Sequence, residues 1–401
     1  MLSDASVTTP LGFSAGAAYC GLKTPGPGTL DLGVLVADAP CTAAALFTSN
    51  RVKAAPILVS RGHLRDGEAR AVVVNSGCAN AVTGEQGMAD ARAMAALTAK
   101  RFGLAARDVL LASTGVIGQQ LDMNKIQDGI ARVKLSRDGG EAFARAMTTT
   151  DSFVKQHVVR VSIGGGGEAV TVAGAAKGAG MIHPDLATLL AVVTTDAAAD
   201  ARYLRGALKR AADASFNMLT IDGDTSTNDM LAALASGKAG NDLLTGYSPE
   251  APAFEEALTA VCTHLARCIA RDGEGATRLI EVEVAGARSL KDARRAARCV
   301  AGSSLVKAAV HGGDPNWGRV LAAVGRSGCA LNLERVDMRI GELLLLRGGS
   351  PQAFSRAGVV DALSRPEVRV SVDLNLGGHS AVAWGCDLSE EYVTFNSAYT
   401  T

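Results

Sequence analysis

The chain has 401 residues, and its 40 Lys and Arg balance 40 Asp and Glu, so the formal net charge is zero. An apolar fraction of 48% suffices for a globular core and argues against intrinsic disorder. Without a basic excess, nucleic acid and anionic membranes are poor candidates for the main partner. No apolar stretch reaches the roughly 18–20 residues of a membrane-spanning helix, and the first twenty residues lack a secretory-signal pattern. We therefore expect a soluble, cytoplasmic protein.

Strands and helices are predicted to alternate along the first half of the chain. An apolar strand at 71–75 runs into the segment Asn75-Ser-Gly-Cys-Ala-Asn80, and apolar spacing predicts a helix over 85–102. A second strand at 109–112 leads directly into Ser113-Thr-Gly-Val-Ile-Gly118. Residues 157–173, with four glycines at their centre, are typical of a hairpin.

The second half continues the same alternation. A 4,3,4,3,1 spacing of apolar residues predicts a helix over 254–269, with Gly273 just past its end. Strands are predicted at 279–284 and 368–376, and Ser289 with Asp292 predicts a capped helix reaching about Val300. We therefore predict a mixed α/β (or α+β) protein of layered sheets and helices without a long linker.

Cysteines and histidines show no metal-binding or catalytic spacing. The eight cysteines form no C-x-x-C pair, and they predict reduced, mostly buried thiols. The six histidines are isolated from one another, so each is more typical of a structural residue than of a metal ligand. The literal G-x-S-x-G at Gly12–Gly16 lacks the preceding apolar strand of a nucleophile elbow.

The most unusual segment is Gly174–Ala191, where Lys177 lies among small residues and is the only charged residue before Asp185. A structural interpretation is a loop followed by a buried helix or strand, with Pro184 suited to a first helical turn. That interpretation leaves Lys177 unexplained, because burying an unpaired amine is costly. A cation in a glycine-lined cleft is suited to a carboxylate ligand.

This segment resembles the processing site of the ornithine acetyltransferase (glutamate N-acetyltransferase) family. Residues Lys177–Leu190 fit the family block K-G-x-G-M-x-x-P-x-x-A-T-x-L position by position. Other family blocks follow in the same order over nearly the whole chain: Asn75–Asn80, Ser113–Gly118, Met147–Ser152, Phe216-Asn217, Asp222–Asp229, Asp272–Gly275, Asp314–Arg319 and Asn396–Thr401.

The resemblance implies a fold of the self-processing type with an N-terminal threonine nucleophile. The chain would cut itself between Ala187 and Thr188, leaving an N-terminal chain 1–187 and a C-terminal chain 188–401. The hydroxyl of Thr188 would attack the preceding carbonyl, and water would cleave the resulting ester. The freed α-amine, with an ordinary pKa of about 7.7–8, can then act as base for its own hydroxyl.

The implied reaction is a two-step transfer of acetyl in arginine biosynthesis. Thr188 takes acetyl from N-acetylornithine, and glutamate then removes it as N-acetylglutamate. Thr114 and Gly115 match the family's oxyanion-hole pair, although the residues alone are also compatible with a plain turn. The resemblance implies no metal and no bound organic cofactor, and it leaves acetyl-CoA open as a second acetyl donor.

The resemblance also implies substrate contacts for residues that are far apart in the sequence. Lys177 would pair with the substrate carboxylate or act near the reacting amide, and Glu274 would bind an amino-acid cation. Thr149 is the best match for a substrate-binding threonine, with a one-residue ambiguity inside the run Thr148–Thr150. Asn396 and Thr401 belong to a tail expected to close the pocket, and the blocks at 222–229 and 314–319 are assigned structural or pocket-shaping roles only.

The resemblance also implies that the two cleaved chains stay associated and pair into a four-chain α2β2 assembly. A smaller lobe is expected at about 289–366. Two alternatives remain open: a self-processing amidase or aminopeptidase of similar fold that uses water as acceptor, and a non-catalytic binding protein that never matures.

Overall fold

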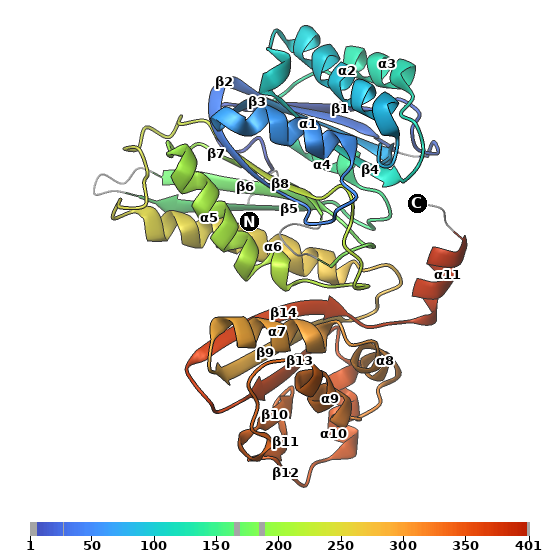
Figure 1. Ribbon diagram of the computed structural model, residues 1–401, viewed down its shortest axis with the longest axis vertical. Helices are drawn as coiled ribbons and strands as arrows, with labels where there is room; N and C mark the ends of the chain where they lie inside the picture. Colours follow the sequence, from blue (N-terminus) through green and yellow to red (C-terminus); the bar gives the residue numbers. More distant parts are fainter. Residues whose placement is uncertain (1–5, 27, 164–168, 184–188, 399–401) are drawn as a thin grey trace.

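The computed structural model describes residues 6–26, 28–163, 169–183 and 189–398. Figure 1 shows a larger body, a smaller unit beneath it, and a C-terminal helix beside both. The larger body contains the strands β1 (Phe13–Ala18), β2 (Leu32–Phe47), β3 (Glu68–Cys78), β4 (Val109–Val116), β5 (Lys155–Ser162), β6 (Ala169–Lys177), β7 (Leu190–Thr195) and β8 (Met230–Ala235). Its helices are α1 (Ala55–His63), α2 (Gly84–Phe102), α3 (Met123–Arg132), α4 (Gly140–Met147), α5 (Ala201–Ala214) and α6 (Ala251–Arg271).

The strands of the larger body form one sheet that is folded over on itself. Its order is β4-β3-β2-β8-β7-β6-β5, with β1 paired to the first half of β2. The long strand β2 pairs with β3 mainly through its first half and with β8 through its second half. A shared core includes Val72 and Leu110 from one half of the sheet, Val192 and Leu234 from the other, and Phe143 of α4. Apolar side chains of the two halves therefore face each other.

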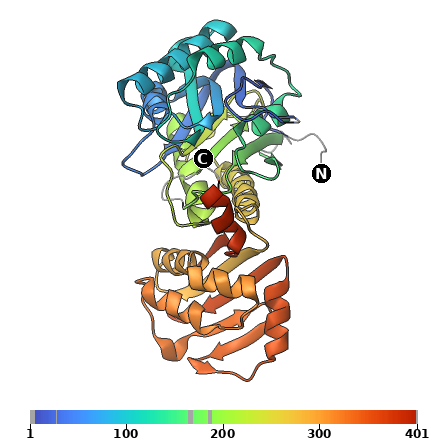
Figure 2. The same ribbon diagram turned by 90° about the vertical axis from the view of Figure 1, so that its right-hand side faces the viewer.

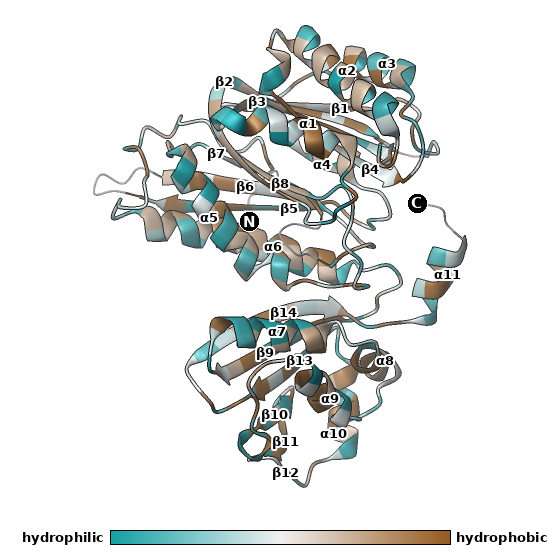
Figure 3. Cartoon of the chain, in the orientation of Figure 1, coloured by the Kyte–Doolittle hydropathy of each residue, from teal (hydrophilic) through white to brown (hydrophobic). Residues whose placement is uncertain are grey.

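Helices cover the two outer faces of the folded sheet. Helices α1, α2 and α3 lie on the side of β3 and β4, and α5 and α6 lie on the side of β5 and β6 (Figure 1). Helix α6 buries the predicted apolar stripe, and a Cβ at Gly174 of β6 would lie 2.7 Å from Val261 Cγ1. Gly174 therefore lets α6 pack closely on the sheet. Figure 3 shows the apolar residues concentrated on the strands and polar residues on the outer parts of the helices.

The smaller unit contains a second sheet with the order β12-β11-β10-β13-β9-β14. Its strands are β9 (Leu279–Ala287), β10 (Asp337–Ile340), β11 (Leu343–Arg347), β12 (Ser350–Pro351), β13 (Glu367–Asp373) and β14 (His379–Cys386). Its helices are α7 (Leu290–Ala301), α8 (Ser304–Gly312), α9 (Gly318–Arg326) and α10 (Arg356–Ser364). The unit thus begins before and ends after the segment 289–366. Helix α11 (Glu390–Ala398) follows and lies at the boundary between the two units (Figure 2).

Most of the predicted elements are present. The helix predicted over 85–102 is α2, the one over 254–269 is α6, and the helix after Ser289 is α7, whose first turn Ser289 caps by accepting from Asp292 N at 3.1 Å. The strand predicted to reach 376 is too long, because β13 ends at Asp373. A buried strand, β7, follows the processing segment, while residues 184–188 themselves lie outside the described part.

The predicted reduced state of the cysteines is confirmed. All eight cysteines fall within the described ranges and none is disulfide-bonded; five of them are buried. Among the described residues, no helix combines the length and apolar character that crossing a bilayer requires.

A buried ion cluster fixes the start of β5. Lys155 is 1% exposed, and its ammonium pairs with the carboxylates of Asp151 and Asp272. Asp272, at the end of α6, also accepts from Ser152 N at 3.0 Å. Asp151 accepts from Gly178 N at 2.7 Å, at the end of β6. The cluster therefore joins β5, β6 and α6 next to Lys177.

We expect Lys155→Met to destabilise the protein by about 3–5 kcal/mol, because it leaves two carboxylates buried without their cation. Thermal unfolding of the purified variant, followed by circular dichroism, measures the effect. Lys209→Met is the matched control: its pair with Asp213 is on the surface, and its loss should cost less than about 1 kcal/mol. Equal losses of stability in both variants would show that the buried cluster stabilises the protein no more than a surface ion pair does.

Candidate active site

A cavity of about 810 Å³ opens between the two halves of the folded sheet. Strands β3, β4 and β6 end at it, and β7 and β8 begin at it, so loops at one end of the sheet supply its walls. Helix α11 contributes Tyr392, Asn396 and Ala398 to the rim. The fold thus brings residues of most family blocks, from Asn75–Asn80 to Asn396–Thr401, to one place, whereas Phe216-Asn217 and Asp314–Arg319 contribute no lining residue.

Six of the predicted site residues line this cavity, namely Thr114, Gly115, Thr149, Lys177, Glu274 and Asn396. Ala187, Thr188 and Thr401 lie outside the described residues. Leu189, the first described residue after the stretch 184–188, lines the cavity, and so does Ile182, one residue before His183. Described residues on both sides of the predicted scissile bond therefore contribute to the cavity wall.

Thr114 and Gly115 lie at the end of β4, where β4 pairs with β3 in parallel, and do not form a plain turn. Gly115 has φ +123°, and a Cβ there would lie 2.4 Å from the carbonyl carbon of Gly77. Only glycine fits this close approach of two backbones. Just before this pair, the carbonyl of Ser113 accepts from Asn228 Nδ2 at 2.9 Å, which ties the end of β4 to the start of β8.

Lys177 is buried at the end of β6, and its Nζ donates to Thr114 Oγ1 at 3.1 Å. Burial lowers the pKa of its amine, and the carboxylates of Asp151 and Asp229 oppose that shift. Because Thr114 accepts from the lysine, its own hydroxyl hydrogen remains available to donate into the cavity. Lys177, which the structural interpretation of the sequence left unexplained, is therefore a buried amine in the cavity wall.

Asp229 is a cavity residue to which the sequence argument assigned no chemistry. It lies directly before β8, is 3% exposed, and its Oδ2 has no hydrogen-bond partner among the described residues. Burial raises the pKa of this carboxyl well above its ordinary value, although Lys177 acts in the opposite direction. It follows two other aspartates, Asp222 and Asp224, in the block 222–229, and the sequence gave no signal that it alone of the three would be buried.

Glu274 is held by partners from two distant segments. Thr150 Oγ1 donates to Glu274 Oε1 at 2.8 Å, and Asn396 Nδ2 donates to Oε2 at 2.9 Å. A Cβ at Gly180 would lie 2.4 Å from Oε2, so a side chain there would displace the Glu274 carboxylate. Within the threonine run, Thr150 contacts Glu274, whereas Thr149 lines the cavity and donates its N–H to Asp151.

The cavity wall carries charges of both signs. Lys23 and Lys177 lie in the wall, and Lys23 Nζ donates to the carbonyl of Thr148 at 2.8 Å. Glu274 and Asp222 contribute carboxylates elsewhere in the wall. Burial together with these carboxylates and Asp224 raises the pKa of Tyr392 to about 12, so its hydroxyl stays protonated. Such a cavity can hold a molecule that carries both an anionic and a cationic group.

Comparisons with known proteins identify the family of the chain. A family model described as the ArgJ family matches residues 14–401. The chain belongs to the ArgJ family. The arginine biosynthesis bifunctional protein ArgJ of Dehalococcoides mccartyi is 51% identical over 401 residues, which cover 100% of this chain and 98% of that protein. The ArgJ of Symbiobacterium thermophilum is 52% identical over 397 residues, covering 98% of each.

A solved structure shows the same fold. One chain of the crystal structure of ArgJ from Bacillus halodurans is 46% identical, with a TM-score of 0.51, and covers 52% of this chain and 98% of its own length. The predicted resemblance and the predicted layered α/β fold are thus confirmed, and the relatives identify the protein as an acyltransferase of arginine biosynthesis.

Asp229→Asn should stabilise the uncleaved protein at neutral pH. A carboxyl whose pKa is raised by folding contributes full stability below its ordinary value of 3.8, and this contribution is lost as pH rises toward the folded-state pKa. The asparagine side chain imitates the protonated carboxyl, so the extra stability of the variant over the wild type should be absent near pH 3.5 and should grow with pH. The gain should amount to about 1.4 kcal/mol for each unit by which folding raises the pKa.

Urea denaturation between pH 4 and 8, with both proteins also carrying Thr188→Ala to keep the chain intact, measures this difference. Asp242→Asn, at an exposed aspartate, serves as the control and should show no trend with pH. A stability difference that stays constant across the pH range would contradict the raised pKa of the Asp229 carboxyl.

Proposed function

We propose that this protein moves acetyl from N-acetylornithine to glutamate through an acetyl-threonine intermediate on Thr188, after self-cleavage between Ala187 and Thr188. The observation that carries the proposal is the convergence of Thr114, Lys177 and Glu274 on one cavity whose wall includes Leu189, the residue after the nucleophile. Family membership supplies the reaction class.

Self-cleavage begins when the Thr188 oxygen attacks the carbonyl carbon of Ala187. The C–N bond breaks, its nitrogen takes the hydroxyl proton, and an ester replaces the amide. Water then hydrolyses the ester, giving a carboxylate on Ala187 and a free hydroxyl and amine on Thr188. The new α-amine has an ordinary pKa near neutrality, so the residue gains its own base.

Acetyl transfer repeats the same chemistry on substrates. The Thr188 oxygen attacks the acetyl carbon, ornithine leaves as the amine, and the amine of glutamate then attacks the acetyl ester. Each tetrahedral intermediate carries a negative oxygen, and the hydroxyl of Thr114 together with the N–H of Gly115 would donate to it. Lys177 supports this role, because it donates to Thr114 Oγ1 and thereby directs the hydroxyl hydrogen elsewhere.

The charges of the cavity suit amino-acid substrates. Ornithine and glutamate derivatives carry a carboxylate, which Lys177 would pair with, and an ammonium group or its precursor, which Glu274 would bind; both residues line the cavity. Thr150 and Asn396 fix the Glu274 carboxylate from two sides, so that it is pre-oriented before substrate arrives. The proposed reaction requires no metal and no organic cofactor.

The sheet order supports a cleaved protein whose chains remain together. Strands β2 and β6 of the first chain flank β8 and β7 of the second, so cutting at residue 187 leaves two chains interleaved in one sheet. The solved ArgJ chain from B. halodurans aligns over 98% of its own length but covers only 52% of this chain. This share is close to that of the proposed C-terminal chain, which has 214 of the 401 residues.

Three finer points are proposed on family grounds. Acetyl-CoA is the second acetyl donor to assay. The cleaved chains would assemble as α2β2, and the protein would be located in the cytoplasm. A native mass of about twice 41.0 kDa in light scattering is expected for the four-chain assembly.

Purified protein should run as two bands, and Thr188→Ala as one intact chain without activity. Chains of 187 and 214 residues correspond to about 19 and 22 kDa when the 41.0 kDa mass is divided in proportion to length. Intact-mass spectrometry locates the cut.

Assays with and without glutamate separate the transferase from a hydrolase, since an amidase would consume acetylornithine in either case. An active, unbroken wild-type chain would exclude the mechanism.

Removing the cavity-wall donors should slow acetyl transfer with little change in folding. We expect Thr114→Val to lower kcat by about 10²–10³, the usual cost of one oxyanion donor, and Lys177→Met to lower kcat/KM by a similar factor. Lys100→Met, on an exposed face of α2, is the control. Initial rates per cleaved chain give the comparison, and unchanged kcat in Thr114→Val would remove Thr114 from the oxyanion site.

A further inference from the structure

The short stretch Met181–His183 is held firmly by residues that come much later in the chain. Asp222 accepts from two consecutive N–H groups, with Met181 N at 2.6 Å from Oδ2 and Ile182 N at 2.9 Å from Oδ1. The carbonyl of Ile182 accepts from Ile221 N at 2.7 Å. The carbonyl of His183 accepts from Thr225 Oγ1 at 2.9 Å. The stretch therefore has its backbone fixed on the loop 220–225.

The side chain of His183 adds a link to the smaller unit. Its Nε2 lies 3.0 Å from Nη2 of Arg298 on α7, and its Nδ1 lies 2.9 Å from Thr220 Oγ1. Arginine can only donate, so Nε2 accepts and the ring proton sits on Nδ1, which donates to Thr220. The imidazole is thus fixed in one tautomer and one orientation, four residues before Ala187.

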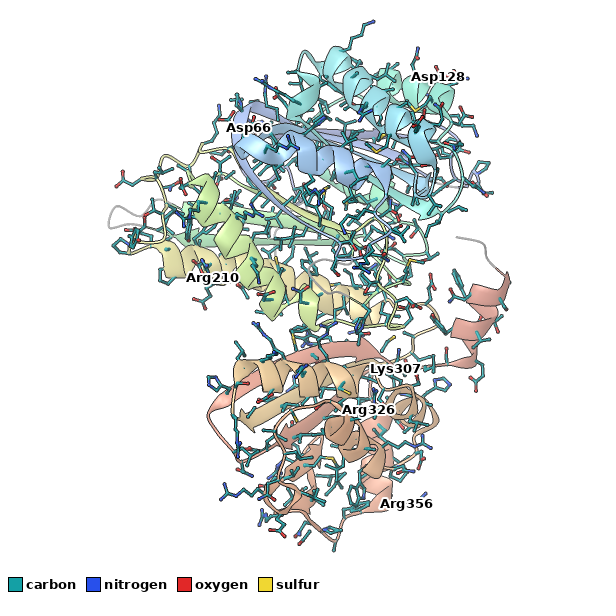
Figure 4. The ribbon with its side chains drawn as sticks, in the orientation of Figure 1. Asp66, Asp128, Arg210, Lys307, Arg326 and Arg356 are labelled. Atoms are coloured by element: carbon teal, nitrogen blue, oxygen red, sulfur yellow. The ribbon has the colours of Figure 1, made fainter. Side chains whose placement is uncertain are left out.

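The loop that holds this stretch is itself anchored. Lys307 of α8 is buried, and its Nζ donates to the carbonyl of Ile221. Figure 4 shows Lys307 at the boundary between the smaller unit and the larger body. The anchoring thus extends from α7 and α8 through the loop 220–225 to Met181–His183.

Met181 has φ +54°, a conformation that side-chain-bearing residues rarely adopt. Two hydrogen bonds to Asp222 hold the chain in this bend. On the downstream side, the carbonyl of Leu189 accepts from Met230 N at 2.9 Å, and Leu190 pairs with both Lys177 and Met230 in the sheet. The chain is therefore fixed on both sides of residues 184–188, with a strained bend on the upstream side.

We propose that Asp222, His183 and Arg298 are positioning residues for self-cleavage, and that they act by fixing the stretch Met181–His183, which precedes the proposed scissile bond. This inference rests on the proposed self-cleavage. Because Asp222 and Arg298 belong to the second chain and His183 to the first, the same contacts would keep Met181–His183 attached to the second chain after the cut.

The test is a time course of cleavage in newly synthesised full-length chain, followed by gel electrophoresis. Asparagine offers only one acceptor oxygen for two N–H groups, so Asp222→Asn should slow cleavage by about 10–100-fold. Arg298→Met should slow it comparably, and Arg298→Lys should recover part of the rate. Once cleaved, Arg298→Met should transfer acetyl at the wild-type rate per cleaved chain. Asp242→Asn and Arg295→Met, both at exposed positions, are the matched controls.

Two further variants keep the test decisive if Asp222→Asn does not fold. Met181→Gly adopts the bend without strain and should cleave at least as fast as wild type, whereas Met181→Val, with its β-branch, should cleave slowly. Wild-type cleavage rates in Asp222→Asn, Arg298→Met and Met181→Val would overturn the positioning role alone. A wild-type chain that never cleaves would instead overturn the proposed function.

Discussion

The site depends on keeping the amine of Lys177 buried beside the hydroxyl of Thr114. Burial disfavours the charged amine, and nearby carboxylates offset part of that cost. Asp151 is the most constrained of them: burial opposes its ionisation, but Lys155, Lys177 and the N–H of Gly178 together lower its pKa below the ordinary value. The ion cluster at the start of β5 therefore has two functions, since it stabilises the end of β6 and sets the charge around Lys177.

The folded sheet explains why one cavity can collect residues from so many segments. Both halves of the sheet have strand ends at this edge, where β3, β4 and β6 end and β7 and β8 begin, and the loops from both halves meet there. The smaller unit adds no strand to this edge. It contributes through Lys307 and Arg298, which contact the loop 220–225 and His183, and through α11, which reaches back from β14 to Glu274. The two units are thus coupled at the site through polar contacts.

Sequence patterns predicted what depends on local periodicity and on long motifs. The stripe of α6, the capped start of α7 and the strands before the Asn75 and Ser113 segments all follow from spacing, and the motif blocks led to Lys177 and Glu274. Long-range geometry could not be predicted. Asp229 differs from its neighbouring aspartates only in burial, and Thr150 contacts Glu274 because of how the loop after α4 bends. Helix α11 has no buried residue and no apolar stripe, so periodicity gave no sign of it.

The interleaving of β2, β8, β7 and β6 would change the thermodynamics of the protein if the chain is cut as proposed between residues 187 and 188. Before the cut, unfolding involves one molecule, and its midpoint is independent of concentration. After the cut, the same loss of structure would also be a dissociation, so dilution itself would weaken the folded state. Neither proposed chain contains a complete sheet, because each lacks the neighbours of its inner strands. The proposed cleavage would therefore make recovery from denaturation a second-order process, and the uncut chain would be the form in which this architecture is most readily assembled.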